Sequence, residues 1–269
     1  MNRNLFLKEM RRNAFSLIIW MIVITILISL TMSVYRMFVE NQSKIMGMMN
    51  LIPKGALQFK GISNFNDLFS VLGFYAVNNI IYMMVLGSIF AIVLSSNILL
   101  KEEYNKTAEY LLARPVTRSE IFVSKLVVLF LYVFLLNLVT ALAGLICMEL
   151  VKNEPFSIRA FLILSLYTLL LNLLFGAIGL FISTLVKRSK PVTTFSIGLV
   201  LICYFIYTVS KITESAAKIG YLSPFEFVNV DVINPAYRLE FLNLLYFTGI
   251  SLLLVTISHR LYNRKDIYT

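Results

Sequence analysis

Six long stretches without a charged residue constrain the fold of this chain most strongly. Each reaches or approaches the roughly 20 residues that a helix needs to cross a bilayer, and none alternates apolar and polar residues like a transmembrane β-strand. Hydrophobic residues make up 59% of the chain, more than in a soluble domain. The stretches are residues 13–35, 68–100, 126–148, 160–186, 191–210 and 241–258.

These stretches predict an all-α integral membrane protein, a single domain over residues 1–269 with six transmembrane helices. The run at 68–100 would be about 50 Å long as a straight helix, whereas the hydrocarbon core is about 30 Å thick. We therefore expect part of residues 68–75 to lie outside the core, or the helix to tilt. The expected spans are approximately 14–35, 74–100, 120–147, 160–186, 191–210 and 239–258.

The distribution of basic residues predicts the orientation. With the N-terminus inside, the cytoplasmic segments hold 15 of the 24 Lys and Arg residues, and their net charge is +9 against +1 outside. The positive-inside rule therefore places both termini in the cytoplasm. No basic face is interleaved with stacking aromatics, which argues against a nucleic-acid partner, and anionic lipid headgroups are the expected partner of this charge.

The N-terminal segment suggests an interfacial helix before the first span. Leu7, Met10 and Ala14 would share one helical face, with basic residues on the other. Simple topogenic charge would explain the same basic residues equally well.

The segment from Lys101 to Lys125 is the only strongly charged, periodic stretch between two apolar runs. Glu102 and Glu103 favour a helix start through the helix dipole. The following residues predict an amphipathic helix. Its apolar face would carry Tyr104, Ala108, Leu111 and Leu112.

A sharp turn should follow this helix. Pro115 pushes Arg114 out of helical geometry, and Thr117 with Glu120 three residues later predicts a capping box that opens the next helix. From the residues alone, the segment could dock against a partner or lie on lipid headgroups.

The order of residues here resembles the cytoplasmic loop of bacterial ABC type-two exporter permeases, which have the type V exporter fold. Both share an acidic residue, a Thr, an acidic-aromatic-Leu-Leu run, Pro-Val-Thr-Arg and a downstream Lys. This chain departs from the pattern at Lys106, where the family often has Gly. The matching positions are Glu103, Thr107, Glu109, Tyr110, Leu111, Leu112, Pro115, Val116, Thr117, Arg118 and Lys125.

The resemblance implies that residues 101–118 are a coupling helix in a cleft of a separate ATPase subunit, which would bind ATP and Mg²⁺. It also implies a bacterial plasma membrane, a second permease copy or paralogue, and export of a peptide, drug, lipid or possibly ion. Arg118 and Lys125 would hold the segment in the headgroup layer. The expected coupling residues are Glu102, Glu103, Tyr104, Thr107, Ala108, Leu111, Leu112, Arg114, Pro115, Arg118 and Lys125.

Two asparagines should meet near the membrane midplane. Asn137 lies 12 residues after Lys125 and Asn172 lies 15 before Lys187, so their depths differ by only about 5 Å. We predict a hydrogen bond between them that joins two helices, although both amides could instead line a substrate path. Small residues that would permit close packing nearby are Thr140, Gly144, Gly176, Gly179 and Ser183. Other candidates for a path or packing role are Asn78, Asn79 and Asn243.

A hairpin of two short external helices is expected between the last two spans. Gly220 should stop the first, and Ser223, Pro224 and Glu226 provide an N-cap, a first-turn proline and a capping-box acid for the second. Asn234-Pro235 should end it. Such a hairpin also resembles the exporter family.

Several functions are disfavoured by what the sequence lacks. It has no G-x-x-x-x-G-K-[ST] phosphate loop. An H-E-x-x-H zinc site needs two histidines, and the chain has only one, His259. We expect His259 to contact lipid headgroups. We therefore predict no catalytic residues, metal or bound cofactor. Alternatives to the permease are an immunity or sensory membrane protein and a gradient-driven carrier, the last disfavoured because no span has a charge at its middle.

Overall fold

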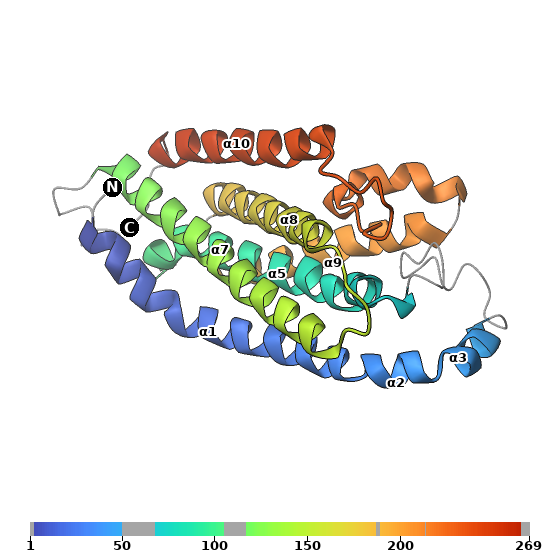
Figure 1. The fold of residues 1–269 in the computed structure, drawn as a ribbon. Helices are drawn as coiled ribbons and strands as arrows, with labels where there is room; N and C mark the ends of the chain where they lie inside the picture. The colour runs from blue at the N-terminus through green and yellow to red at the C-terminus, as the bar shows by residue number, and fades with distance from the viewer. Residues whose placement is uncertain (1–2, 50–67, 105–116, 187–188, 213, 265–269) are drawn as a thin grey trace.

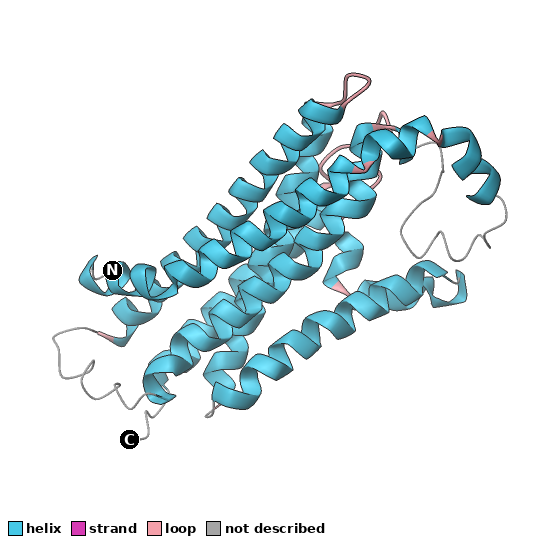
Figure 2. Cartoon of the chain, turned by 90° about the horizontal axis from the view of Figure 1, so that it is seen from below, coloured by secondary structure: helices cyan, strands magenta, loops and turns pink. Residues whose placement is uncertain are grey.

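The computed structural model describes residues 3–49, 68–104, 117–186, 189–212 and 214–264. These ranges hold six helices that are long and apolar enough to cross a membrane, as predicted, and no strand (Figure 2). The six helices are α1 (Arg3–Ser33), α5 (Val71–Tyr104), α7 (Arg118–Val151), α8 (Ile158–Leu185), α9 (Ser189–Ile212) and α10 (Phe241–Arg264).

Helix α5 is the central element of the bundle. It contacts α1, α7, α8 and α9, while α1 packs on α7 and α10 packs on α8 (Figure 1). In its most apolar stretch 72% of the residues are buried, against 22% in α1 and 11% in α10. The outer helices therefore expose most of their apolar surface, as expected for helices that face lipid or a partner.

Glycines allow α5 to approach its neighbours closely. A Cβ at Gly179 of α8 would lie 2.0 Å from the Ser95 hydroxyl, and one at Gly144 of α7 would lie 2.5 Å from the Tyr75 hydroxyl. Small residues do permit close packing here, but the helix that approaches Gly144 and Gly179 is α5, whereas the prediction paired α7 with α8. Gly176 has ordinary space, because its nearest neighbour atom, on Leu129, would be 3.5 Å away.

At one end of the bundle α1 begins, α5 ends, α7 begins and α10 ends (Figure 1). We call it the inner end, and the opposite end the outer end, after the orientation that the basic residues predict. Helix α5 continues to Tyr104, so Glu102 and Glu103 belong to its last turn. The prediction that these two residues start a separate helix is wrong. Lys and Glu propagate a helix well and no Gly or Pro intervenes, so the apolar helix simply continues past the membrane core.

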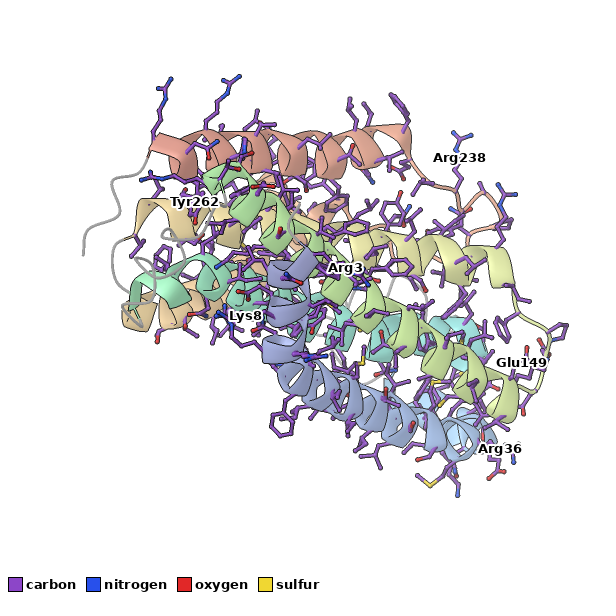
Figure 3. The ribbon with its side chains drawn as sticks, turned by 90° about the vertical axis from the view of Figure 1, so that its left-hand side faces the viewer. Arg3, Lys8, Arg36, Glu149, Arg238 and Tyr262 are labelled. Atoms are coloured by element: carbon purple, nitrogen blue, oxygen red, sulfur yellow. The ribbon has the colours of Figure 1, made fainter. Side chains whose placement is uncertain are left out.

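The predicted N-terminal interfacial helix is not a separate element. It forms the first turns of the continuous helix α1, and these turns, from Arg3 past Lys8, run at an angle to the remainder (Figure 3). Glu9 on this part is fully buried against the bundle. The pattern of charges did not reveal that one acidic residue faces inward.

At the outer end two short helices follow α1, namely α2 (Tyr35–Glu40) and α3 (Gln42–Met49). The Arg36 guanidinium donates to the Leu150 carbonyl at 2.8 Å, which ties α2 to the end of α7, and Figure 3 shows Arg36 and Glu149 at the same end of the bundle. Contacts within the chain therefore fix the position of α2 at this end of the bundle.

The hairpin that was predicted to be external consists of two 3₁₀ helices, η2 (Glu214–Leu222) and η3 (Pro224–Phe227). Ser223 is the N-cap of η3, as predicted, and accepts from the Phe225 N–H at 3.3 Å. Three details differ from the prediction. Gly220 does not stop η2, η3 ends at Phe227 well before Asn234, and Glu226 forms no capping box.

Glu226 is instead held by a cation from α9. Its carboxylate lies 2.5 Å from the Lys211 Nζ, and an ionic partner is a stronger attraction than a backbone N–H. Further along, the Tyr237 hydroxyl donates to the Asn229 carbonyl at 2.8 Å. Burial and the nearby Tyr167, Asp231 and Glu240 raise the pKa of Tyr237, so it stays a neutral donor at neutral pH.

Candidate functional site

The structure describes the two helix ends that flank the predicted coupling segment, namely the end of α5 and the start of α7. We call these two helix ends the stems of the segment. The backbone of residues 101–104 is helical, whereas the side chains of Glu102, Glu103 and Tyr104 lie outside the described part of the chain. Six further predicted coupling residues also lie outside it, namely Thr107, Ala108, Leu111, Leu112, Arg114 and Pro115, whereas Arg118 and Lys125 are described.

The start of α7 is fixed by the predicted capping box. The Thr117 hydroxyl accepts from the Glu120 N–H at 3.2 Å, and the Glu120 carboxylate accepts from the Thr117 N–H at 3.0 Å. Two backbone donors at the helix end are therefore satisfied. The chain enters α7 at a defined point directly after the predicted turn.

Lys125 joins the two stems. Its ammonium group is fully buried and donates to the Ile98 carbonyl at 2.5 Å, so α7 is bonded to α5 eight residues after Thr117 and six before Tyr104. The prediction that Lys125 lies in the headgroup layer is wrong, because its side chain points into the bundle. Lys125 is thus a positioning residue between the stems.

Helix α1 also contributes to this buried cluster. Glu9 Oε1 lies 4.0 Å from the Lys125 Nζ, and Glu9 Oε2 accepts from Arg12 at 2.7 Å. The Tyr132 hydroxyl of α7 donates to the Met10 carbonyl of α1. A buried charge is tolerated only with such partners, so α1, α5 and α7 are held in one arrangement at the inner end.

Helix α10 closes the inner end from the other side of α7. The Ser119 hydroxyl and His259 Nε2 are 2.9 Å apart, and the His259 ring lies 5.1 Å from that of Phe122. The Arg118 guanidinium donates to the Asn263 carbonyl at 3.5 Å. His259 was expected to meet headgroups, but the structure places it against α7.

The predicted hydrogen bond between midplane asparagines is present. Asn172 Nδ2 donates to Asn137 Oδ1 at 3.2 Å, and the Ser88 hydroxyl of α5 donates to Asn172 Oδ1 at 3.1 Å. Gly87 makes room for the amide, because a Cβ there would lie 2.5 Å from Asn172 Nδ2. Asn137 and Asn172 are buried, so this three-helix network lies inside the single chain.

The other candidate asparagines are separate from this network. The Asn78 amide donates to the Phe74 carbonyl of its own helix at 3.1 Å, and Asn243 donates to Glu240 at the outer start of α10. The side chain of Asn79 lies outside the described part.

One polar contact escaped the sequence analysis. Asn97 Nδ2 of α5 donates to the Thr193 hydroxyl of α9 at 3.0 Å. Asn97 lies in the same apolar run as Asn78, so its amide was a detectable signal. Its partner could not be identified, because a linear sequence does not reveal which helix faces it.

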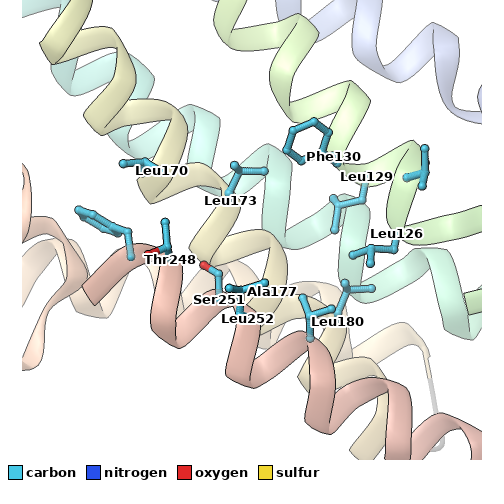
Figure 4. A pocket seen from close by; sticks show the side chains of 13 residues that line it. Leu126, Leu129, Phe130, Leu170, Leu173, Ala177, Leu180, Thr248, Ser251 and Leu252 are labelled. Atoms are coloured by element: carbon cyan, nitrogen blue, oxygen red, sulfur yellow. The ribbon is translucent and has the colours of Figure 1, made fainter. Parts of the chain in front are cut away.

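Two cavities flank the bundle. A polar one of about 500 Å³ lies at the outer end, where Tyr35, Ser70, Asn153 and Glu154 are among the lining residues. An apolar one of about 440 Å³ lies between α7, α8 and α10 (Figure 4). Their lining residues occupy different levels, so neither cavity runs from one end of the chain to the other.

Comparison with known families decides the class of protein. The model of a family described as ABC-2 family transporter protein matches residues 3–267. The chain belongs to the ABC-2 transporter family. ABC-2 permeases are transmembrane subunits without an ATPase domain and work with ABC ATPase subunits in membranes, as the resemblance implied. This ABC-2 permease is therefore a multi-pass membrane subunit without an ATPase domain. No curated protein matches its sequence significantly.

Proposed function

We propose that this permease exports a hydrophobic or amphipathic substrate and that an ABC ATPase docks on residues 101–118. The observation that carries the proposal is the bond from Lys125 to the Ile98 carbonyl, which joins both stems of that segment. A force applied between Tyr104 and Thr117 would act on α5 and α7 together.

The buried cluster supports transmission of such a force to the rest of the bundle. Glu9 connects the stems to α1, and α5 contacts four other transmembrane helices. Movement of the ATPase pair would in this way change the packing of the whole chain rather than bend one loop. Packed interfaces of this kind switch between discrete arrangements rather than deform continuously.

We further propose that two permease copies, identical or related, form the path between them. Two observations support a path between copies: Asn137 and Asn172 form hydrogen bonds inside one chain, and neither cavity described above crosses it. Helices α1, α9 and α10 leave most of their apolar stretches unburied, which leaves surface for a second copy. The basic inner end would face the cytoplasm of a bacterial cell, with both termini inside.

The test is affinity purification of the tagged protein from its native membranes in mild detergent, followed by mass spectrometry. We expect a P-loop ATPase at near-equal stoichiometry with the wild type, and its loss with Glu103→Ala or Leu111→Asp. Leu222→Asp is the matched control, because Leu222 is 74% exposed and lies at the end of η2, in the hairpin between α9 and α10 and not in the proposed docking segment.

Reproducible absence of any ATPase from the wild-type preparation would contradict the proposal and favour a carrier or an immunity protein. Recovery of the ATPase with Leu111→Asp at wild-type levels would refute docking on this segment alone. Transport into inside-out vesicles that requires ATP would then identify the substrate class.

A further inference from the structure

Asn97 joins α5 to α9 at the inner part of the bundle. Its amide nitrogen donates to the Thr193 hydroxyl at 3.0 Å, and that hydroxyl donates back to the Asn97 amide oxygen at 3.3 Å. No other side-chain hydrogen bond joins α5 and α9 among the described residues. A single polar pair between two apolar helices fixes their register, because another register would separate the two partners.

Ser196 is a second hydroxyl on the inner half of α9, and it is unused in this arrangement of the helices. Its side chain is fully buried, on a helical face that also carries the buried Val192 and Val200. Within the described part of the chain its hydroxyl has no hydrogen-bond partner. Buried hydroxyls normally have partners, because desolvation of an unpaired one destabilises the fold.

The spacing of Thr193 and Ser196 allows one hydroxyl to take the place of the other. Residues three apart are neighbours on a helix surface and lie about 4.5 Å apart along its axis. A movement of α9 by about one turn toward the inner end would therefore bring Ser196 to Asn97. Packed helices do step past one another by one turn, because their interfaces have discrete stable positions. The Asn97 amide would keep its bond to the Val93 carbonyl of its own helix, at 2.8 Å here.

Helix α9 has few neighbours that oppose such a step. Only 22% of its most apolar stretch is buried, and it packs mainly on α5 and on η2 of the hairpin. The hairpin is bonded to α9 itself, since the Ser223 hydroxyl donates to the Cys203 carbonyl at 2.7 Å. It meets α8 through aromatic rings, Phe225 lying 5.3 Å from Phe175, and this contact involves no hydrogen bond.

The position of Asn97 connects this contact to the stems of the coupling segment. Asn97 directly precedes Ile98, whose carbonyl accepts from Lys125 of α7, and it lies seven residues before Tyr104 at the end of α5. A displacement of the stems would therefore act on the Asn97 side chain and, through it, on α9.

We propose that Asn97 is a positioning residue that holds α9 in one of two registers. Its partner is Thr193 in this structure and Ser196 after α9 has moved by one turn. The inference rests on the proposed function in one respect, because docking of the ATPase would supply the force for the step. The two registers are a property of the permease alone, so they can be tested without the ATPase.

Thermal unfolding of the purified permease in detergent tests the second register. Thr193→Val removes the hydroxyl and keeps the shape of the side chain, so we expect α9 to move until Ser196 meets Asn97. Ser196→Ala alone should leave Tm unchanged or raise it, because the hydroxyl is unpaired here. In the Thr193→Val background the same change should lower Tm by roughly 2–4 °C. Equal effects of Ser196→Ala in the two backgrounds would overturn the proposal.

Two controls separate this dependence from general effects on stability. Ser210→Ala removes a buried hydroxyl of α9 that donates to the Tyr207 carbonyl of its own helix at 2.7 Å, so its effect should be the same in both backgrounds. Asn97→Leu should abolish the difference between the backgrounds, whereas Asn78→Leu should not, because the Asn78 amide is bonded within α5. A difference that survives Asn97→Leu would overturn the role of Asn97.

Disulfide trapping in the complex with the ATPase tests whether ATP drives the step. In a chain with Cys147→Ala and Cys203→Ala, Asn97→Cys is combined with either Thr193→Cys or Ser196→Cys, and peptide mass spectrometry measures the cross-link. A disulfide requires Cα atoms within about 7 Å, so the first pair should cross-link without nucleotide and the second several-fold more with bound ATP. An unchanged yield of the second pair, with the ATPase still copurified, would refute the drive by ATP, whereas failure of the ATPase to copurify would contradict the proposed function instead.

Discussion

Replacement of Lys125 by Met should measure how strongly the inner cluster holds the bundle together. The change removes the hydrogen bond from the Lys125 ammonium group to the Ile98 carbonyl. It also removes the positive charge that lies 4.0 Å from the fully buried Glu9 carboxylate. Breaking a buried ion pair costs about 3–5 kcal/mol, and because Arg12 still contacts Glu9 we expect a smaller loss, about 2–3 kcal/mol. For a chain of this size that lowers Tm by roughly 5–10 °C.

The double variant Glu9→Gln with Lys125→Met separates charge from packing. It removes both buried charges, so its stability should return to within about 1 kcal/mol of the wild type. Lys152→Met is the matched control, because Lys152 pairs with Glu149 at the exposed outer end, where such pairs contribute about 0–1 kcal/mol. Thermal unfolding in detergent is the assay. Additive losses in the double variant, or a Tm change below 1 °C with Lys125→Met, would refute the reasoning.

Two further changes test other parts of the bundle. Asn172→Leu removes two interhelical hydrogen bonds, to Asn137 and Ser88, and should destabilise the fold by about 1–2 kcal/mol in thermal unfolding. An unchanged Tm together with lost transport would instead assign the Asn172 amide to the substrate path. Thr117→Ala removes the capping box with Glu120. It should lower the free energy of unfolding by about 1 kcal/mol and speed hydrogen exchange in the first turn of α7. Equal exchange rates in Thr117→Ala and wild type would show that the cap does not fix this turn.

Features that depend on position along a helix could be predicted from the sequence. The rise per residue was enough to match the depths of Asn137 and Asn172, and the capping box at Thr117 is a local pattern of four residues. The six spans follow from length and hydropathy alone. In each case the physical cause lies within one helix or in its depth in the bilayer.

Features that depend on which face a helix turns inward could not be predicted. Lys125 lies near a charged loop and so resembles a headgroup anchor, yet its side chain points at α5. Glu9 is likewise buried because its face of α1 is turned toward the bundle. Glu226 fits a capping box in sequence, but Lys211 on another element competes for it. These outcomes are set by neighbours that are distant in the sequence.

The hydrogen-bonded network of Ser88, Asn137 and Asn172 also bears on how the chain is made. Its members lie on α5, α7 and α8, which leave the ribosome in that order. When Asn172 reaches the membrane, Ser88 and Asn137 have already been synthesised, so its amide can find both partners on arrival. The Asn172 amide, in the middle of α8, can therefore form both hydrogen bonds as soon as α8 enters the membrane, because the helices that carry its partners have already been translated.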